Sequence, residues 1–190
     1  QRYDGPGNYH DVAYSIAVDM NGNVYVTGQS SGVGGTTRYD YATIKYSSDG
    51  SELWVARYNH NDFDDIAKSL IIDDSDNIFV TGSSDGTSLG SPNFATIKYN
   101  SAGSEMWVAR YTGGGGGDNA HAMVLDSGDN IYVTGDSKNP APPFSSDYLT
   151  IRYNAVTGDT VWTARYNGPD NDTDQSTSIA LDLSGNVYVT

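Results

Sequence analysis

The sequence predicts an all-β fold built from repeated four-stranded antiparallel units, and two observations lead to this prediction. One string of residues returns four times along the 190-residue chain, starting at Asp19, Asp73, Asp126 and Asp182. Each copy runs through a short turn into Val-Tyr-Val-Thr or a close variant. The second observation is the constant spacing of about 54 residues, a period typical of arrays of one supersecondary unit.

Each unit divides into four short segments that are rich in β-branched and aromatic residues. In the first unit we expect strands near residues 15–18, 24–27, 41–46 and 53–58, separated by Gly, Asn, Asp and Ser turns. No helical period is sustained over ten residues. Four antiparallel strands at this period indicate the blades of a β-propeller.

The third and fourth predicted strands carry large side chains on both faces. Because side chains alternate along a strand, even-numbered and odd-numbered residues of 41–46 and of 53–58 lie on opposite faces. This pattern is expected for a sheet that packs between two neighbouring blades. Gly50, Gly103 and Gly158 each stand four residues before a tryptophan. That spacing resembles the tryptophan-docking repeats of quinoprotein dehydrogenases, which implies packing between blades and no quinone site.

Composition narrows the class of protein. Hydrophobic residues make up 37% and charged residues 18%, with 22 glycines and 15 tyrosines, as in a turn-rich β protein. The absence of cysteine excludes disulfides and thiolate metal sites. No apolar run reaches the length of a membrane span, so we expect no membrane insertion. The net charge of −14 argues against nucleic-acid binding and favours solubility and cation binding.

Three motifs resemble the SBBP family, a bacterial β-propeller repeat. They are Asp-x-x-Gly-Asn-Val-Tyr-Val-Thr-Gly, Asp-Tyr-Ala-Thr-Ile-Lys-Tyr and Trp-x-Ala-Arg-Tyr, and together they cover essentially the whole chain. Asp76 and Asp129 depart from the pattern, since they stand where the turn glycine is expected. The resemblance implies a propeller fold and a secreted or surface-associated protein. The family mostly lacks an assigned activity.

The chain is interpreted as a single repeat domain, 1–190, whose units span approximately 5–59, 60–112, 113–167 and 168–190. Arg2-Tyr3-Asp4 aligns with Arg57-Tyr58-Asn59, the end of a fourth strand. We therefore expect three full blades and part of a fourth, as a segment of a six- to eight-bladed propeller. Other protein chains, or further blades of the same polypeptide, are expected to cover both end faces, and a second copy of the chain is the simplest version.

A first series of aspartates gives the candidate metal ligands. Asp11, Asp65, Asp118 and Asp174 precede the first strand of each unit. Because the first strand of a propeller blade lines the central channel, their carboxylates would ring one mouth of it and could hold Ca²⁺ or another hard cation. In the alternative interpretation, each Asp bonds to its own loop or to a neighbouring blade's backbone. The second series, which begins with Asp19, is interpreted as turn chemistry.

Other candidates are weaker. His10, His60 and His121 share no metal-ligand spacing, and no nucleophile is paired with them in the sequence. The glycine run 113–117 lacks the Gly-Lys-Ser/Thr of a phosphate loop and is interpreted as a connection between blades. Loops of variable length are where binding of a glycan or another surface ligand is expected; they span 29–39, 83–92 and 136–146.

The sequence therefore favours a non-catalytic extracellular or cell-surface module with a structural or binding role, which assembles with other chains. No residue is assigned to catalysis and none to a cofactor. One alternative is an extracellular propeller enzyme, such as a hydrolase, a lyase or a quinoprotein-like oxidoreductase, which should interrupt the repeat with unique convergent polar residues. Another is a filament or coat subunit.

Overall fold

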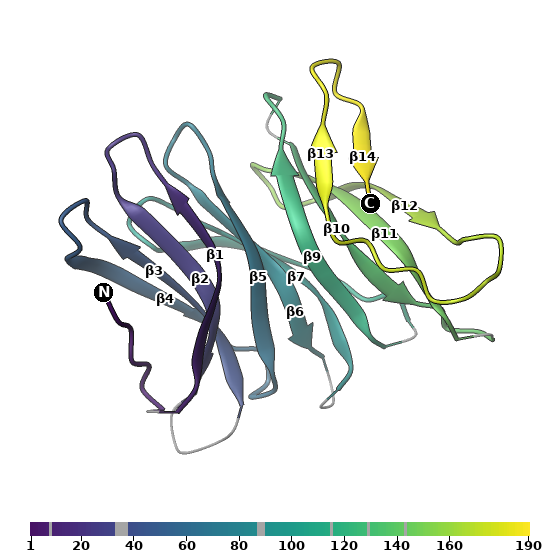
Figure 1. The fold of residues 1–190 in the computed structure, drawn as a ribbon, viewed down its shortest axis with the longest axis horizontal. Helices are drawn as coiled ribbons and strands as arrows, with labels where there is room; N and C mark the ends of the chain where they lie inside the picture. Colours follow the sequence, from purple (N-terminus) through teal and green to yellow (C-terminus); the bar gives the residue numbers. More distant parts are fainter. Residues whose placement is uncertain (8, 33–37, 87–89, 115, 129, 143) are drawn as a thin grey trace.

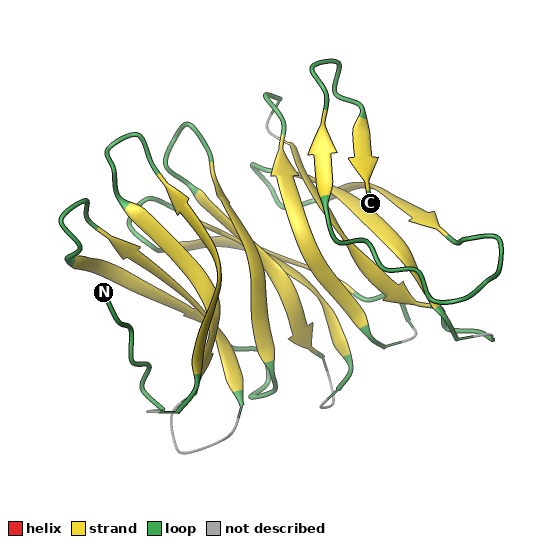
Figure 2. Ribbon diagram, in the orientation of Figure 1, coloured by secondary structure: helices red, strands yellow, loops and turns green. Residues whose placement is uncertain are grey.

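Three four-stranded antiparallel sheets stand side by side in chain order, followed by a two-stranded sheet (Figure 1). The computed structural model describes residues 1–7, 9–32, 38–86, 90–114, 116–128, 130–142 and 144–190. The described residues contain strands, turns and loops but no helix (Figure 2), and hence no helix that could cross a membrane. We call the three large sheets blades 1, 2 and 3.

Within every blade the strand order follows the sequence. Blade 1 contains β1 (Asp11–Val18), β2 (Val24–Ser31), β3 (Tyr39–Tyr46) and β4 (Glu52–Tyr58). Blade 2 contains β5 (Asp65–Ile72), β6 (Ile78–Asp85), β7 (Pro92–Tyr99) and β8 (Glu105–Tyr111). Blade 3 contains β9 (Asp118–Leu125), β10 (Asn130–Lys138), β11 (Ser146–Asn154) and β12 (Thr160–Tyr166). The small sheet pairs β13 (Ile179–Leu181) with β14 (Val187–Val189).

The predicted all-β propeller fold and its strands are confirmed. The strands are longer than the sequence pattern indicated, and β1 begins at Asp11, four residues before the predicted start at Ser15. The first aspartate series therefore begins its strands in blades 1 to 3, whereas Asp174 lies in the loop before β13. The first strands contact one another from blade to blade, β1 with β5 and β5 with β9, as expected for the inner strands of a propeller.

A β-bulge interrupts the pairing of the first two strands in every complete blade. The register shifts beside Tyr14 in blade 1, Lys68 in blade 2 and His121 in blade 3. The extra residue pushes the backbone of the first strand toward the second. A Cβ at Gly82 on β6 would overlap the Ile66 carbonyl oxygen. The bulge therefore explains the glycine that follows Val-Thr in every complete unit.

The core lies between the blades. One buried cluster joins Tyr25, Tyr41 and Tyr58 of blade 1 to residues of blade 2 that include Val80 and Ile97. A second cluster joins Phe79 and Phe94 of blade 2 to blade 3. Trp54 packs against the first cluster, whereas the opposite face of blade 1 forms a third cluster from Ala42, Ile44 and Tyr46. The predicted two-faced strands are thus confirmed.

The turns between first and second strands are held by the second aspartate series, as predicted. The Asp182 carboxylate accepts hydrogen bonds from the backbone N–H of Ser184 at 2.9 Å and of Asn186 at 2.8 Å, and from Asn186 Nδ2 at 2.7 Å. These bonds, with that from Asn186 Nδ2 the strongest, lower the pKa of Asp182 to about 2. Asp19, Asp73 and Asp126 accept the same pattern of bonds.

Candidate functional site

Each complete blade contains a polar cluster in which an arginine on the fourth strand meets side chains of the second and third strands. In blade 1 the Arg57 guanidinium pairs with Asp40, with Nη2 2.7 Å from Oδ2, and Nη1 donates to Ser30 Oγ at 2.8 Å. We call these groups the arginine clusters. The same repeat positions hold Arg165, Asp147 and Ser137 in blade 3, and Arg110, Asn93 and Ser84 in blade 2.

The four aspartates predicted as metal ligands are each bonded within their own loop. Asp118 in addition accepts a hydrogen bond from Ser137 Oγ at 2.6 Å, which connects it to the arginine cluster of blade 3. No three His, Cys, Asp or Glu side chains gather to hold a metal ion anywhere in the described part of the chain. The cation site stays a prediction. The backbone N–H donors are Gly5 to Asp11 at 2.9 Å, His60 to Asp65 at 2.7 Å, Gly113 to Asp118 at 2.6 Å and Gly168 to Asp174 at 2.7 Å.

Asp65 is the most perturbed carboxyl group of this series. It is fully buried, and burial raises its pKa to about 7, against the opposing interactions with the Ser84 side chain, the His60 N–H and the positive charge of Arg110. Its Oδ1 has no hydrogen-bond partner among the described residues. Burial and the same Arg110 charge lower the pKa of His60. Burial is therefore the main cause of both pKa shifts, and the Arg110 charge acts on both groups.

Blades are joined by a tryptophan that docks on the glycine of the next blade. Trp107 Nε1 donates to the Ala155 carbonyl at 3.2 Å, and a Cβ at Gly158 would lie 2.8 Å from Trp107 Cδ2. Trp54 repeats this arrangement on Gly103, where a Cβ would lie 2.7 Å from Cδ2. A side chain at either glycine would displace the indole. The predicted blade-to-blade role of the Gly-x-x-x-Trp spacing is confirmed at both interfaces.

The segment before β1 stands in for the end of a fourth strand. Arg110 Nη1 of blade 2 donates to Tyr58 Oη of blade 1 at 2.8 Å. Arg57 Nη1 of blade 1 donates to Tyr3 Oη at 3.1 Å in the same way. Tyr3 therefore lies on blade 1 as Tyr58 lies on blade 2, in agreement with the alignment of the two Arg-Tyr pairs.

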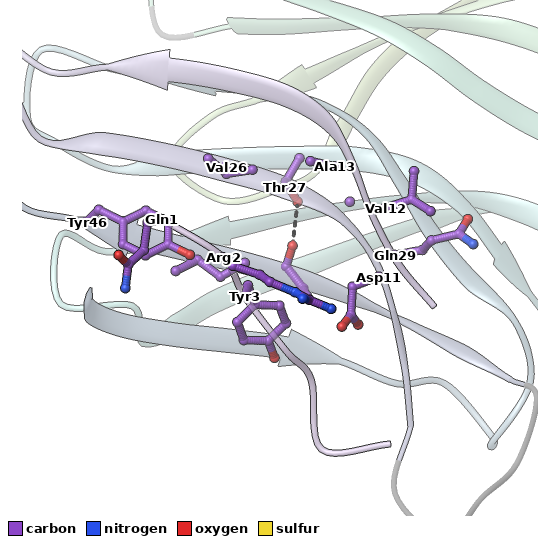
Figure 3. A pocket seen from close by; sticks show the side chains of 13 residues that line it. Gln1, Arg2, Tyr3, Asp11, Val12, Ala13, Val26, Thr27, Gln29 and Tyr46 are labelled. Carbon is purple, nitrogen blue, oxygen red and sulfur yellow. Dashed lines mark hydrogen bonds between the residues drawn. The ribbon is translucent and has the colours of Figure 1, made fainter. Parts of the chain in front are cut away.

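An apolar hollow of about 290 Å³ opens between this segment and blade 1 (Figure 3). Gln1, Arg2 and Tyr3 border one side of it. We call the blade side the open face of blade 1, because no other blade of the described chain covers it. Its residues are Ala13, Val26, Ala42, Ile44 and Tyr46.

The sequence analysis missed one pair of titratable side chains, His121 and Asp136. His121 Nε2 lies 2.6 Å from Asp136 Oδ1, and Asn119 Nδ2 donates to Asp136 Oδ2 at 3.2 Å. The two residues are 15 positions apart and meet only because β9 and β10 pair with a bulge at His121. In the sequence, the sole signal is that Tyr14 and Lys68 occupy this position in the other units.

The remaining candidates are two histidines, the glycine run and the variable loops. His60 stacks on Tyr58, with ring centroids 6.4 Å apart, and His10 contributes its backbone carbonyl to Ser31. In the glycine run, Gly113, Gly114, Gly116 and Gly117 lie in the connection between β8 and β9, and residue 115 lies outside the described residues. Of the variable loops, residues 33–37, 87–89 and 143 lie outside them as well, as does Asp129.

Comparison with family models gives one match, to the β-propeller repeat named SBBP, over residues 3–35, 53–90 and 161–190. These segments make up more than half of the chain. The chain belongs to the SBBP β-propeller repeat family. No curated protein matches it. The second match runs through β4, β5 and β6, so the SBBP unit includes the last strand of one blade and the first two strands of the next. The family unit therefore straddles the blade interface described above.

Proposed function

We propose that this protein is a non-catalytic structural module, secreted or on the cell surface, that packs blade to blade against a second copy of itself. The main observation behind this proposal is the open face of blade 1, which no other blade of the described chain covers. The resemblance to SBBP proteins, which are typically extracellular, supports the location. The non-catalytic role is supported by the arginine clusters and the first aspartate series, since their hydrogen bonds run to groups of the repeat itself.

The open face of blade 1 has the composition of an internal blade interface. The five residues at the same repeat positions of blade 2 lie in the interface with blade 1 and are at most 2% exposed. In blade 1, Ala42, Ile44 and Tyr46 are buried in a cluster on which Tyr3 packs, but Ala13 is exposed and Val26 is half-buried. Burying such apolar surface is the main favourable term in association. The residues of blade 2 are Ala67, Val80, Ala95, Ile97 and Tyr99.

The side chain that fits this face is present in β14. In the interface of blades 1 and 2, Tyr25 of β2 is fully buried and belongs to the cluster that contains Ala67 and Val80. Tyr188 stands at the repeat position of Tyr25 and is 56% exposed. Tyr188 of one copy therefore matches the hollow on the open face of blade 1 of another copy. Such a contact would be head-to-tail, so it extends an array of blades or closes a ring.

Sedimentation velocity at protein concentrations of about 5–500 μM tests the association. The buffer contains about 0.15 M salt, which screens the repulsion between copies that each carry a net charge of −14. We expect the mean mass to rise with concentration. Tyr188→Ser removes the inserted ring and Ala13→Arg blocks the receiving hollow. Each should weaken association by about tenfold or more, as for a buried aromatic anchor.

Tyr9→Ser is the matched control, because Tyr9 is 59% exposed and lies outside both surfaces. Its association should equal that of the parent chain. Circular dichroism of each variant should show the parent β spectrum. A chain that remains monomeric over the whole range, or a loss of association that Tyr9→Ser shares, would refute the proposal.

A further inference from the structure

The arginine cluster of blade 2 differs from the other two by one residue. In blade 1 the guanidinium of Arg57 pairs with Asp40, and in blade 3 that of Arg165 lies 3.1 Å from Asp147. Asn93 takes the place of this aspartate in blade 2. Asn93 is 6% exposed, much as Asp40 is. The side chain at this position is thus buried in both blades, but in blade 2 it has no negative charge.

Arg110 consequently keeps one side of its guanidinium group unpaired. Its Nη1 donates to Tyr58 and Ser84, and its Nη2 to the carbonyls of Ser84 and Asp85. In blade 1 the corresponding Nε also donates to Asp40 Oδ2, at 3.1 Å. Arg110 forms no ion pair and no Nε hydrogen bond with the described residues. An arginine fork that meets only neutral acceptors retains the capacity to bind a carboxylate.

Arg110 borders a hollow of about 440 Å³ whose described lining belongs to blade 2 and to the loops that connect it to blades 1 and 3. Arg110 and Asn93 line it together with neutral donors and acceptors, and His60 borders it. The pKa of His60 is lowered by burial and by Arg110, so this ring adds no second positive charge at neutral pH. The neutral lining residues besides Asn93 are Gly86, Ser91, Thr112, Gly114 and Gly116.

The charge of Arg110 interacts with the carboxyl group of Asp65 within this cluster. The Asp65 Oδ2 is already occupied by the His60 N–H. In blade 2 the residue after Ser84 is the buried Asp85, whose carboxylate accepts a hydrogen bond from the Gly90 N–H. The exchange of Asp for Asn93 therefore removes one carboxylate from the partners of the arginine in blade 2.

We propose that this hollow binds a carboxylate ligand, with Arg110 pairing to the ligand as Arg57 pairs to Asp40 and Arg165 to Asp147. The neutral groups around the arginine suit the hydroxyls of an acidic sugar. The site is separate from the open face of blade 1, so it does not depend on self-association.

The test is a titration with sodium glucuronate, sodium acetate and glucose, at constant ionic strength, followed by ¹H–¹⁵N NMR of the Arg110 Nε–H and the Gly114 and Gly116 amides. We expect the carboxylates to shift these signals and glucose to leave them unchanged. A stronger response to glucuronate assigns the ligand to acidic sugars, and an equal response to acetate assigns it to carboxylates of any source; both support the site.

Asn93→Asp restores the internal pair and should weaken glucuronate binding by about tenfold or more, in keeping with the strength of a charge-assisted pair. Asn21→Asp adds the same charge in the exposed turn between β1 and β2 and should leave binding unchanged. Since Asn93→Asp reproduces the residue found in blades 1 and 3, the variant should fold. Binding that persists in Asn93→Asp, equal loss in Asn21→Asp, or an equal response to glucose would overturn the proposal.

Discussion

Gly82→Ala is expected to lower the free energy of unfolding by about 3 kcal/mol or more, which is severe for one methyl group. Gly82 pairs with Ala67 at the bulge of β5. The new Cβ would overlap the Ile66 carbonyl oxygen and come within 2.8 Å of Ala67 Cα. Both obstacles are backbone atoms, so relief requires the inner strand to move away from β6. Urea unfolding followed by tryptophan fluorescence measures the loss.

Gly32→Ala provides the control for this substitution. Gly32 directly follows β2, and among the described residues the atom nearest to a Cβ there would be Asp40 Oδ1, at 3.5 Å, an ordinary contact. The stability of this variant should stay within about 0.5 kcal/mol of the parent. Equal stabilities of the two variants would show that the bulge does not constrain the glycine.

Trp107→Ala should cost about 3 kcal/mol, as is usual for truncation of a large core aromatic. The variant removes the indole that docks on Gly158 and the hydrogen bond to the Ala155 carbonyl. It also removes the contact with Phe79 inside blade 2, at a centroid distance of 6.0 Å. Blades 2 and 3 lose their outer attachment. Thermal and urea unfolding measure the effect.

Trp162→Ala separates the contribution of packing inside a blade from that of docking on the next blade. Trp162 makes the same contact within its blade, with Tyr132 at a centroid distance of 5.9 Å. It makes no contact of the docking type with a described residue. Its truncation should therefore cost about 1 kcal/mol, and the difference of about 2 kcal/mol reports blade-to-blade docking. Equal losses for the two tryptophans would contradict this assignment.

The repeat made most of the fold predictable. Three sequence features correspond to features of the fold: the period of about 54 residues, the alternation in 41–46 and the glycine before each tryptophan. Because these features recur along the chain, a match in one unit could be checked against the others. The bulge was not predicted, because an extra residue such as His121 leaves no mark in the alternation of a single strand. Its trace was the glycine after Val-Thr, which fits only where a second backbone approaches.

The candidate site was predicted less well. Asp11, Asp65, Asp118 and Asp174 were recognised as a series, but their hydrogen-bond donors lie five or six residues earlier in loops whose path the sequence does not give. The arginine clusters bring three strands together, and in blade 1 the arginine lies 17 and 27 residues from its Asp and Ser partners. The exchange of Asp for Asn93 is visible in the sequence, yet it acquires meaning only once Arg110 is placed beside it.

Hydrogen exchange of the three indole N–H groups in dilute protein tests most directly that blades are joined by tryptophan docking. Trp54 and Trp107 donate to carbonyls of the next blade, at 3.1 and 3.2 Å. Trp162 donates to no described residue. The indole signals of Trp54 and Trp107 should exchange at least about tenfold more slowly than that of Trp162, since their hydrogen bonds must open first. Equal exchange rates for all three would contradict the docking of one blade on the next.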